Sequence, residues 1–408
     1  MYALYHHRTQ GREVEAVHIH GLATGLEELG YEVEIIGPPG VEVNPDVVAS
    51  HVSSKKGRLL RWIAERAPQT IFECLEIGYN LVAVPRLLRR YSAARPELIY
   101  ERYSLYNATG AIVSRLTGVP LALEVNDTVH VDRTRQGKSV VMPGVAGWFE
   151  RRILEGATSI VVVSNYLRDL LIGAGVPAEK IIVTPNAVDA GRFSPDQAAS
   201  AAVRQRYGLD KMTVVGFAGS FTKWHGVEFL VRACAELMST RRDVGVLMVG
   251  DGVRRSDSEA LARELGIADR CVFTGRVPHC EMPDYMGAMD IGVMPASNPF
   301  GSPMKVFEYM AMGVPPVAPQ YGPMEEAVVN GETGLLFQPD QHAGLVSCLR
   351  TLVESPERRA AMGAAAREKV LSQHQWVHNA GAVVEALQRK QQLSHPTVVA
   401  QTAHQEAQ

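Results

Sequence analysis

The sequence predicts an α/β protein of two domains, each built around a parallel β-sheet. Its 408 residues exceed the length at which a single hydrophobic core stops growing. Short apolar runs alternate with amphipathic segments, which is typical of strands that crossover helices cover on both faces. A stretch rich in Pro, Asn, Gly and Ser, at 184–200, separates two such halves.

The expected strands are short apolar runs along the chain. They are MYALYHH at the start, LALEV (121–125), SIVVVS (159–164), KIIVTP (180–185), TVVGFAG (213–219), GVLMVG (245–250), CVFTG (271–275), IGVMP (291–295) and GLLF (334–337). The segment at 227–240 is an expected helix, because its apolar residues recur near helical spacing. Ligands bind beyond the carboxyl ends of parallel strands, so functional motifs are expected in the loops that follow them.

This pattern predicts the domain boundaries. We place the first domain at 1–187 and the second at 188–370. A helical segment follows at 371–390, and the polar end of the chain, 391–408, is expected to be disordered.

The composition narrows the class of protein. Apolar residues make up 46% and charged residues 21% of the chain, as in an ordinary globular protein. The net charge of -3, without a dense Lys/Arg run, argues against a nucleic-acid partner. Five scattered cysteines without a C-x-x-C pair indicate reduced thiols rather than disulfides or a zinc site.

Targeting signals are not expected. The start of the chain lacks the basic and apolar regions of a signal peptide, and no apolar stretch approaches the roughly 20 residues that span a bilayer. We therefore expect a cytoplasmic protein without a transmembrane segment. Contact with the inner face of the membrane stays open.

The loop GSFTKWHG, at 219–226, is a candidate anion site. Gly219 and Ser220 end a predicted strand, and Lys223 and His225 precede a predicted helix. Free N–H groups at a helix start attract anions, and a cation nearby adds to the attraction. The loop matches neither the P-loop nor the dinucleotide-binding pattern. An ordinary strand–helix turn stays open as the alternative.

The segment NPFGSPMKVFE, at 298–308, also combines a predicted helix start with a nearby cation. Ser302 is an expected N-cap and Pro303 an expected first helical residue, which leaves the following amides unpaired. Lys305 lies at the positive end of the helix dipole, where a cation is unfavourable unless an anion binds there. The segment therefore predicts a second anion site.

Glu308 lies one helical turn beyond Lys305 among apolar neighbours. A carboxylate there must be solvated or must accept hydrogen bonds, and the two adjacent hydroxyls of a ribose are suitable donors. Two anion-binding helix starts and a diol acceptor suggest a nucleoside diphosphate. A surface ion pair between Lys305 and Glu308 is the alternative.

These motifs together resemble the retaining GT-B glycosyltransferases of family four. The resemblance covers nearly the whole chain and is carried by PNAVD, GSFTKWHG, VGDG, FTGRVP and SPMKVFEYMAMGVPPVAP. It implies a GT-B fold, in which two Rossmann-like domains face a central cleft. The nucleotide sugar is expected on the second domain and the acceptor mainly on the first. The helix at 371–390 is expected to cross back onto the first domain.

The resemblance also implies roles for single residues. Lys223, Lys305 and Asn126 are expected to be catalytic. The residues expected to bind the donor are Gly11, Gly219, Ser220, His225, Arg276, Val277, Gly301, Ser302, Pro303, Met304, Val306 and Glu308. On the acceptor side we expect Glu124, Asp127 and His130, although a merely solvated loop is the alternative there.

The chain departs from the family pattern at three places. Phe300 stands where many members carry the first acidic residue of a Glu-x7-Glu pair, of which Glu308 is the second. Ser220 and His225 stand where many members have Arg and Lys. Asn126 and Asp127 stand where a histidine often follows the strand. We interpret these changes as altered substrate handling rather than loss of activity.

The implied reaction retains the anomeric configuration without a covalent enzyme intermediate, a metal or a cofactor. A UDP-sugar is preferred over a GDP-sugar as donor, and the acceptor is a saccharide, a lipid-linked sugar or a small metabolite. The expected setting is polysaccharide or glycoconjugate biosynthesis. Two alternatives stay open. One is a nucleotide-sugar 2-epimerase of the same fold, and the other is a non-catalytic subunit that binds nucleotide sugars.

Overall fold

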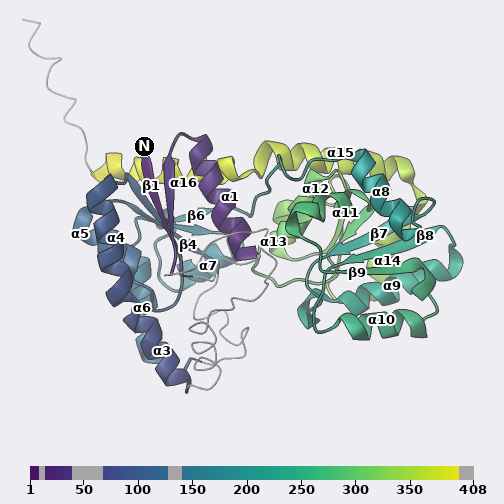
Figure 1. Cartoon of the computed structure of the whole chain (residues 1–408), viewed down its shortest axis with the longest axis horizontal. Coiled ribbons are helices and arrows are strands. Elements are labelled where there is room, and N and C mark those ends of the chain that lie inside the picture. The colour runs from purple at the N-terminus through teal and green to yellow at the C-terminus, as the bar shows by residue number, and fades with distance from the viewer. Residues whose placement is uncertain (9–13, 39–67, 127–139, 395–408) are drawn as a thin grey trace, which may run out of the picture.

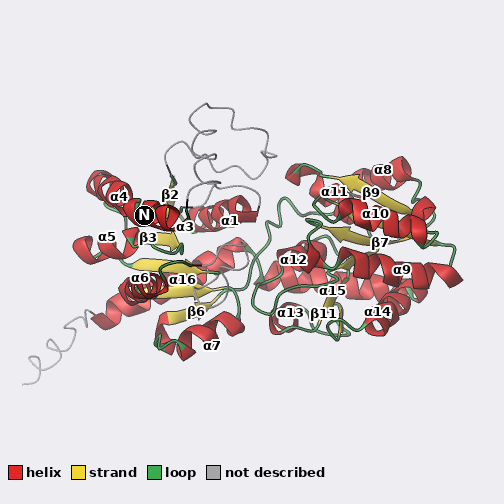
Figure 2. Cartoon of the chain, turned by 90° about the horizontal axis from the view of Figure 1, so that it is seen from below, coloured by secondary structure: helices red, strands yellow, loops and turns green. Residues whose placement is uncertain are grey.

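The computed structural model describes residues 1–8, 14–38, 68–126 and 140–394. Two parallel sheets lie side by side, each with helices on both faces (Figures 1 and 2). The predicted α/β class is confirmed.

The first sheet has the strand order β2-β1-β3-β4-β5-β6, and all of its recorded pairs are parallel. The strands are β1 (Tyr2–His6), β2 (Glu32–Ile36), β3 (Leu98–Arg102), β4 (Leu121–Val125), β5 (Ser159–Val162) and β6 (Ile181–Val183). The helices are α1 (Val14–Glu28), α3 (Gln69–Gly78), α4 (Asn80–Ala94), α5 (Thr109–Thr117), α6 (Pro143–Gly156) and α7 (Asn165–Gly173), with a 3-10 turn η2 (Ala178–Lys180).

The second sheet has the order β12-β11-β10-β7-β8-β9 and is also parallel. Its strands are β7 (Thr213–Ala218), β8 (Val244–Val249), β9 (Cys271–Gly275), β10 (Ile291–Val293), β11 (Pro316–Pro319) and β12 (Leu335–Phe337). The helices are α8 (Gln197–Tyr207), α9 (Val227–Thr240), α10 (Arg255–Glu264), α11 (Met282–Gly287), α12 (Met304–Ala311), α13 (Gly322–Ala327), α14 (His342–Glu354) and α15 (Pro356–Gln373). Short 3-10 turns are η3 (Lys223–His225), η4 (Ala268–Arg270) and η5 (His279–Glu281).

The apolar runs of the sequence all fall on strands, but β2, β3 and β11 were not among them. Strands β2 and β3 carry charged residues. In β3, Glu101 is fully buried, and its carboxylate pairs with His6 of β1 and accepts a hydrogen bond from the Gly110 amide at 2.9 Å. A buried, partnered carboxylate interrupts the apolar pattern by which a central strand is recognised.

The last helix, α16 (Trp376–Ser394), packs against α1 of the first domain. Figure 1 shows α15 and α16 in yellow along one side of both domains. Helix α15 continues to Gln373, so α16 begins later than the 371–390 expected from the sequence. Gly21 and Gly25 of α1 face Trp376, and their lack of a side chain lets the two helices approach closely.

Replacing Gly25 by Ala is expected to destabilise this helix pair. A Cβ atom at Gly25 would lie 2.5 Å from the backbone oxygen of Trp376, so α16 must shift. We expect the free energy of unfolding in urea to fall by about 1–3 kcal/mol. Gly381→Ala is the matched control on α16, because a Cβ there meets no atom within 4 Å and the better helix propensity stabilises by about 0.5–1 kcal/mol. Equal effects of both substitutions would contradict the packing argument.

Two buried histidines predict sensitivity to acid. The pKa of His18 is lowered to about 4, mainly by burial and secondly by the positive charge of Arg102. The pKa of His374 is also lowered to about 4, mainly by burial and secondly by the positive charge of Lys369. In the unfolded chain a histidine takes up a proton near pH 6.5, whereas these two stay neutral in the folded protein until about pH 4. Folding stability is therefore complete above pH 6.5 and is lost as the pH falls from 6.5 towards 4.

We expect His18 alone to account for about 2 kcal/mol of lost stability between pH 8 and pH 5. Urea titrations of His18→Gln at the two pH values should show a smaller loss than those of the wild-type protein. His342→Gln is the control, because 39% of the His342 side chain is exposed. A wild-type pH dependence in His18→Gln would contradict the prediction.

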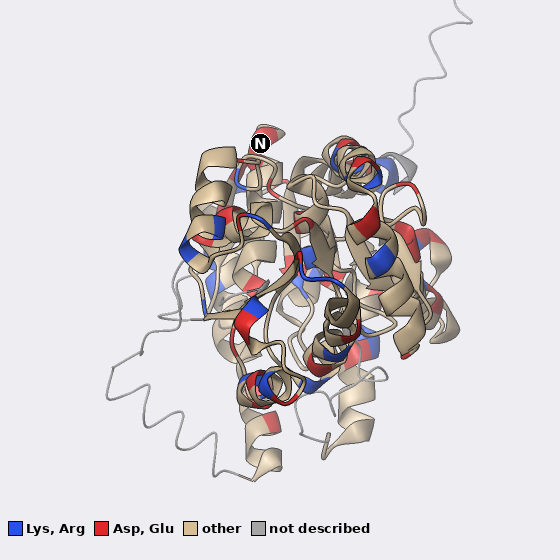
Figure 3. Cartoon of the chain, turned by 90° about the vertical axis from the view of Figure 1, so that its right-hand side faces the viewer, with Lys and Arg blue, Asp and Glu red and all other residues tan. Residues whose placement is uncertain are grey.

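Basic and acidic residues are interspersed over the side of the molecule seen in Figure 3. In the described part of the chain, no helix is long and apolar enough to cross a membrane.

Candidate active site

The two domains touch through loops that follow the carboxyl ends of strands. The Ser164 hydroxyl, just beyond β5, donates a hydrogen bond of 2.7 Å to the Phe300 carbonyl, which lies in the segment after β10. Phe300 is 9% exposed and belongs to the apolar cluster of the first domain that contains Leu167. The Asn165 amide donates to the Glu326 carboxylate at 3.2 Å. Phe300, which stands in place of the first glutamate of the Glu-x7-Glu pattern, thus joins the two domains.

The two candidate anion motifs of the second domain meet beside the end of β7. A Cβ atom at Gly219 would lie 2.5 Å from Cε of Lys305, so the lysine chain crosses directly over the glycine. Gly250, after β8, has φ +132°, and a Cβ there would lie 1.9 Å from the Gly219 carbonyl oxygen. Glycines therefore let the backbone loops and Lys305 pack together at one edge of the sheet.

His225 stabilises the loop after β7 from inside. Its ring is buried, and Nδ1 donates to the Ser220 carbonyl oxygen at 2.5 Å. The Trp224 ring lies against the imidazole with ring centroids 3.6 Å apart and the two planes tilted by 39°. Ser220 and Lys223 are exposed. His225 therefore holds the loop in shape, and a direct contact of His225 with the donor stays a prediction.

The predicted N-cap role of Ser302 is wrong. Helix α12 begins at Met304, Pro303 occupies the N-cap position, and no side chain caps the helix. Ser302 instead binds the linker between the domains: its hydroxyl accepts a hydrogen bond from the Asn186 amide, and its carbonyl accepts one from the Asn186 side chain, both at 2.9 Å. Ser302 therefore forms a tertiary contact with a residue distant in the sequence, and its local sequence does not reveal that partner. The amide of Gly301 donates to the side-chain oxygen of Asn298 at 2.5 Å.

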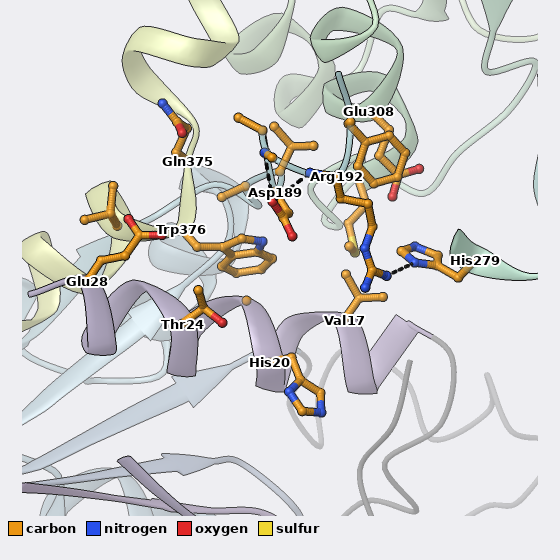
Figure 4. Close-up of a pocket in the computed structure, with 18 residues that line it drawn as sticks. Val17, His20, Thr24, Glu28, Asp189, Arg192, His279, Glu308, Gln375 and Trp376 are labelled. Carbon is orange, nitrogen blue, oxygen red and sulfur yellow. Dashed lines mark hydrogen bonds between the residues drawn. The ribbon is translucent and has the colours of Figure 1, made fainter. Parts of the chain in front are cut away.

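A cavity of about 500 Å³ lies between the domains (Figure 4). Helix α1, the linker at 187–193, η5, the start of α12 and the start of α16 contribute its walls. Met304 and Glu308 line it from α12. Glu308 is 8% exposed, and no hydrogen bond to its carboxylate is recorded among the described residues. The carboxylate therefore has acceptor capacity to offer a ligand in the cavity.

The alternative prediction is a surface ion pair between Lys305 and Glu308. In the described ranges, no ion pair joins these two residues. Burial raises the pKa of the Glu308 carboxyl, and the charges of Lys305 and Arg192 oppose this effect. Glu308 is thus a buried acid whose charge depends on cations nearby.

Arg192 and His279 also line this cavity, and neither was among the predicted site residues. The Asp189 carboxylate accepts hydrogen bonds from the amides of Gly191 and Arg192 at 3.0 Å, which fixes the linker turn. Arg192 Nη1 lies 2.6 Å from Nδ1 of His279. Figure 4 marks this contact with a dashed line. The motif PNAVDAGRF contains the turn and the arginine, but its contact with η5 exists only in the folded chain.

The other predicted donor residues are distributed around this region. Arg276 is exposed and Val277 is half-buried in the loop after β9, and neither lines the cavity of Figure 4. Val306 is fully buried in the core of the second domain. Gly11, Asp127 and His130 lie outside the described residues.

Two predicted residues of the first domain, Glu124 and Asn126, lie at the end of β4. Glu124 is 4% exposed, and its carboxylate forms an ion pair with Arg102 at 2.6 Å. Asn126 is half-buried and donates a hydrogen bond to Glu124. This places Glu124 behind Asn126 rather than at the surface.

Known proteins share both halves of this architecture. Residues 15–187 match the family described as glycosyl transferase 4-like domain, and residues 200–369 match the family described as glycosyl transferases group 1. The 2-deoxystreptamine glucosyltransferase of Streptomyces kanamyceticus is 32% identical over 289 residues, which are 69% of this chain and 73% of that protein. This chain belongs to the group 1 glycosyltransferases. The resemblance seen in the sequence motifs is thereby confirmed.

Two further proteins place this group 1 member among its relatives. A GDP-mannose-dependent phosphatidylinositol monomannoside mannosyltransferase of Mycolicibacterium smegmatis is 32% identical over 243 residues, 58% of this chain. The match spans 64% of the mannosyltransferase. The crystal structure of HepE from Anabaena with UDP is similar in fold, with a TM-score of 0.68 and 20% identity over 95% of this chain and all of HepE. The GT-B fold is therefore confirmed.

Proposed function

We propose that this group 1 member transfers a glycosyl unit from a nucleoside-diphosphate sugar to an acceptor hydroxyl. The observation that carries the proposal is the Glu308 carboxylate, which is buried at an interdomain cavity without a recorded hydrogen-bond donor in the described chain. A ribose in the cavity supplies two hydroxyl donors to such a group. Charge-assisted hydrogen bonds to the diol then fix the nucleoside.

The diphosphate is proposed to lie over the edge where Lys305 crosses Gly219. The first two amides of α12, those of Met304 and Lys305, lack an intrahelical acceptor as in any helix, and they add to the positive potential there. Lys223, exposed on η3, is a second cation of this loop. These groups stabilise the charge that the departing diphosphate gains, and the proposal needs neither a metal nor a cofactor.

We propose that the reaction proceeds with retention. The acceptor hydroxyl attacks the anomeric carbon on the face from which the diphosphate departs. The new C–O bond forms as the bond from the anomeric carbon to the β-phosphate oxygen breaks, and the hydroxyl proton passes to that phosphate oxygen. The protein contributes positioning and charge stabilisation.

For the substrates, we propose only the nucleotide of the donor and the chemical class of the acceptor. UDP is preferred over GDP as the nucleotide. HepE was crystallised with UDP-glucose, whereas the mycobacterial relative is named as GDP-mannose-dependent, so both nucleotides need comparison. The relatives are named for phosphatidylinositol monomannoside and for 2-deoxystreptamine. A saccharide, a lipid-linked sugar or a small metabolite is proposed for this chain.

A thermal-shift panel tests the proposal. We expect UDP, GDP or their sugar conjugates to stabilise the protein by about 2.7 kcal/mol at 100 times their dissociation constant. Inorganic phosphate at the same concentration serves as the control for a general anion effect. Absence of any nucleotide shift would overturn the donor assignment. Release of UDP that increases with an acceptor distinguishes transfer from epimerisation and from simple binding.

A further inference from the structure

The side chain of Asn126 has a defined orientation at the end of β4. Its Nδ2 group donates a hydrogen bond to Oε1 of Glu124. An ionised carboxylate only accepts hydrogen bonds, so the NH₂ end of the amide must face Glu124. The carbonyl oxygen Oδ1 therefore points away from Glu124.

Glu124 is itself held from several sides. Arg102 Nη1 lies 2.6 Å from its Oε1, and the hydroxyls of Tyr100 and Tyr5 donate to Oε2 at 3.1 and 3.3 Å. His18 Nδ1 lies 3.8 Å from Oε1. Contacts from β1, β3 and α1 thus surround the carboxylate, which leaves it little freedom to move.

These partners stabilise the ionised form of Glu124. Burial by itself raises the pKa of this carboxyl, but Arg102, His18 and the hydrogen bonds from Asn126 and Tyr100 outweigh burial and lower it. Glu124 is therefore ionised at neutral pH. An ionised Glu124 cannot donate to Oδ1 of Asn126, so a flipped amide would lose its hydrogen bond and face a repulsive oxygen.

Oδ1 of Asn126 is left as an acceptor just beyond the carboxyl end of β4. No hydrogen bond to it is recorded in the part of the chain that the structure describes, and the residue is half-buried rather than enclosed. Asn126 directly follows the carboxyl end of β4, the end at which parallel sheets hold their ligands.

We propose that Glu124 is a positioning residue that fixes Asn126 so that its Oδ1 accepts a hydrogen bond from a substrate hydroxyl. The hydroxyl belongs either to the attacking group or to the transferred sugar. This inference rests on the proposed glycosyl transfer. Asn126 stays neutral throughout: it aligns the hydroxyl, while the proton of the attacking group passes to the departing diphosphate as the new C–O bond forms.

The test uses the full chain with UDP-glucose and water as the attacking group, and follows UDP release together with the dissociation constants of UDP and UDP-glucose. Asn126→Ala removes the acceptor, and Glu124→Gln allows the amide to flip, because a glutamine can donate to Oδ1. We expect each single substitution to lower turnover or UDP-glucose affinity by about ten-fold, the effect of one hydrogen bond.

The double variant separates positioning from a structural role. If Glu124 acts through Asn126, then adding Glu124→Gln to Asn126→Ala costs no further activity. Glu150→Gln is the matched control, since Glu150 is another buried carboxylate of the first domain that accepts from a tyrosine, Tyr103, at 3.1 Å. It is expected to leave the ratio of UDP to UDP-glucose affinities and the turnover of the folded protein unchanged.

The outcomes are distinct. A weaker binding of UDP-glucose with unchanged UDP binding assigns the hydroxyl to the transferred sugar, and lower turnover with both affinities unchanged assigns it to the attacking group. Wild-type values in Asn126→Ala, or additive losses in the double variant, would overturn the inference. If Glu124→Gln does not fold, wild-type values in Asn126→Ala still overturn it. A wild-type protein that binds neither UDP nor GDP contradicts the proposed function itself.

Discussion

Glu308→Gln is expected to lower the affinity for UDP by about one to two orders of magnitude. The substitution keeps the shape of the side chain but removes the charge that the ribose hydroxyls are proposed to meet. Hydrogen bonds to a charged group contribute roughly 1.5–3 kcal/mol, which corresponds to this loss. The carboxylate is buried at the cavity, so water compensates little for the lost interaction. Titration calorimetry with UDP measures the effect.

A nucleotide without ribose hydroxyls provides the control. The 2',3'-dideoxy form of UDP never makes the proposed bonds, so its affinity should be nearly the same for the wild-type protein and for Glu308→Gln. Glu264→Gln, at an exposed glutamate at the end of α10, should bind both nucleotides as the wild type does. Equal losses for UDP and its dideoxy form in Glu308→Gln would rule out the ribose assignment.

Lys305→Ala is expected to reduce turnover by about 100-fold while weakening the binding of UDP-glucose only a few-fold. The diphosphate gains negative charge as its bond to the sugar breaks, so a cation beside it stabilises the transition state more than the bound substrate. Removal of one such preorganised group typically costs about 10²–10³ in rate. The lysine crosses Gly219 within van der Waals distance, which holds its chain in place at the sheet edge.

The comparison of kcat with the dissociation constant of UDP-glucose decides this prediction. Lys211→Ala is a suitable control, because Lys211 is exposed in the turn before β7. An unchanged kcat in a folded Lys305→Ala protein would remove Lys305 from the mechanism. A loss confined to binding would instead indicate an interaction that is equal in substrate and transition state.

Local sequence alone determined the fold class and most of the strands. Continuous apolar runs such as 213–219 and 245–250 become buried parallel strands because both of their faces are covered by helices. It also determined where the functional motifs lie, because loops after such strands meet at one edge of the sheet. The convergence of Lys305 with Gly219 follows from this rule.

Only the tertiary structure decided how single polar residues are used. Ser302 has the sequence of an N-cap, but it binds the linker through Asn186. His225 turns inward to the carbonyl of Ser220, and Glu124 is enclosed by partners from three other elements. A polar side chain takes whichever partner the folded chain brings within about 3 Å, and residues more than 100 positions apart supply many of these partners. Apolar periodicity is a local property, whereas the choice of hydrogen-bond partner is made only when distant segments meet.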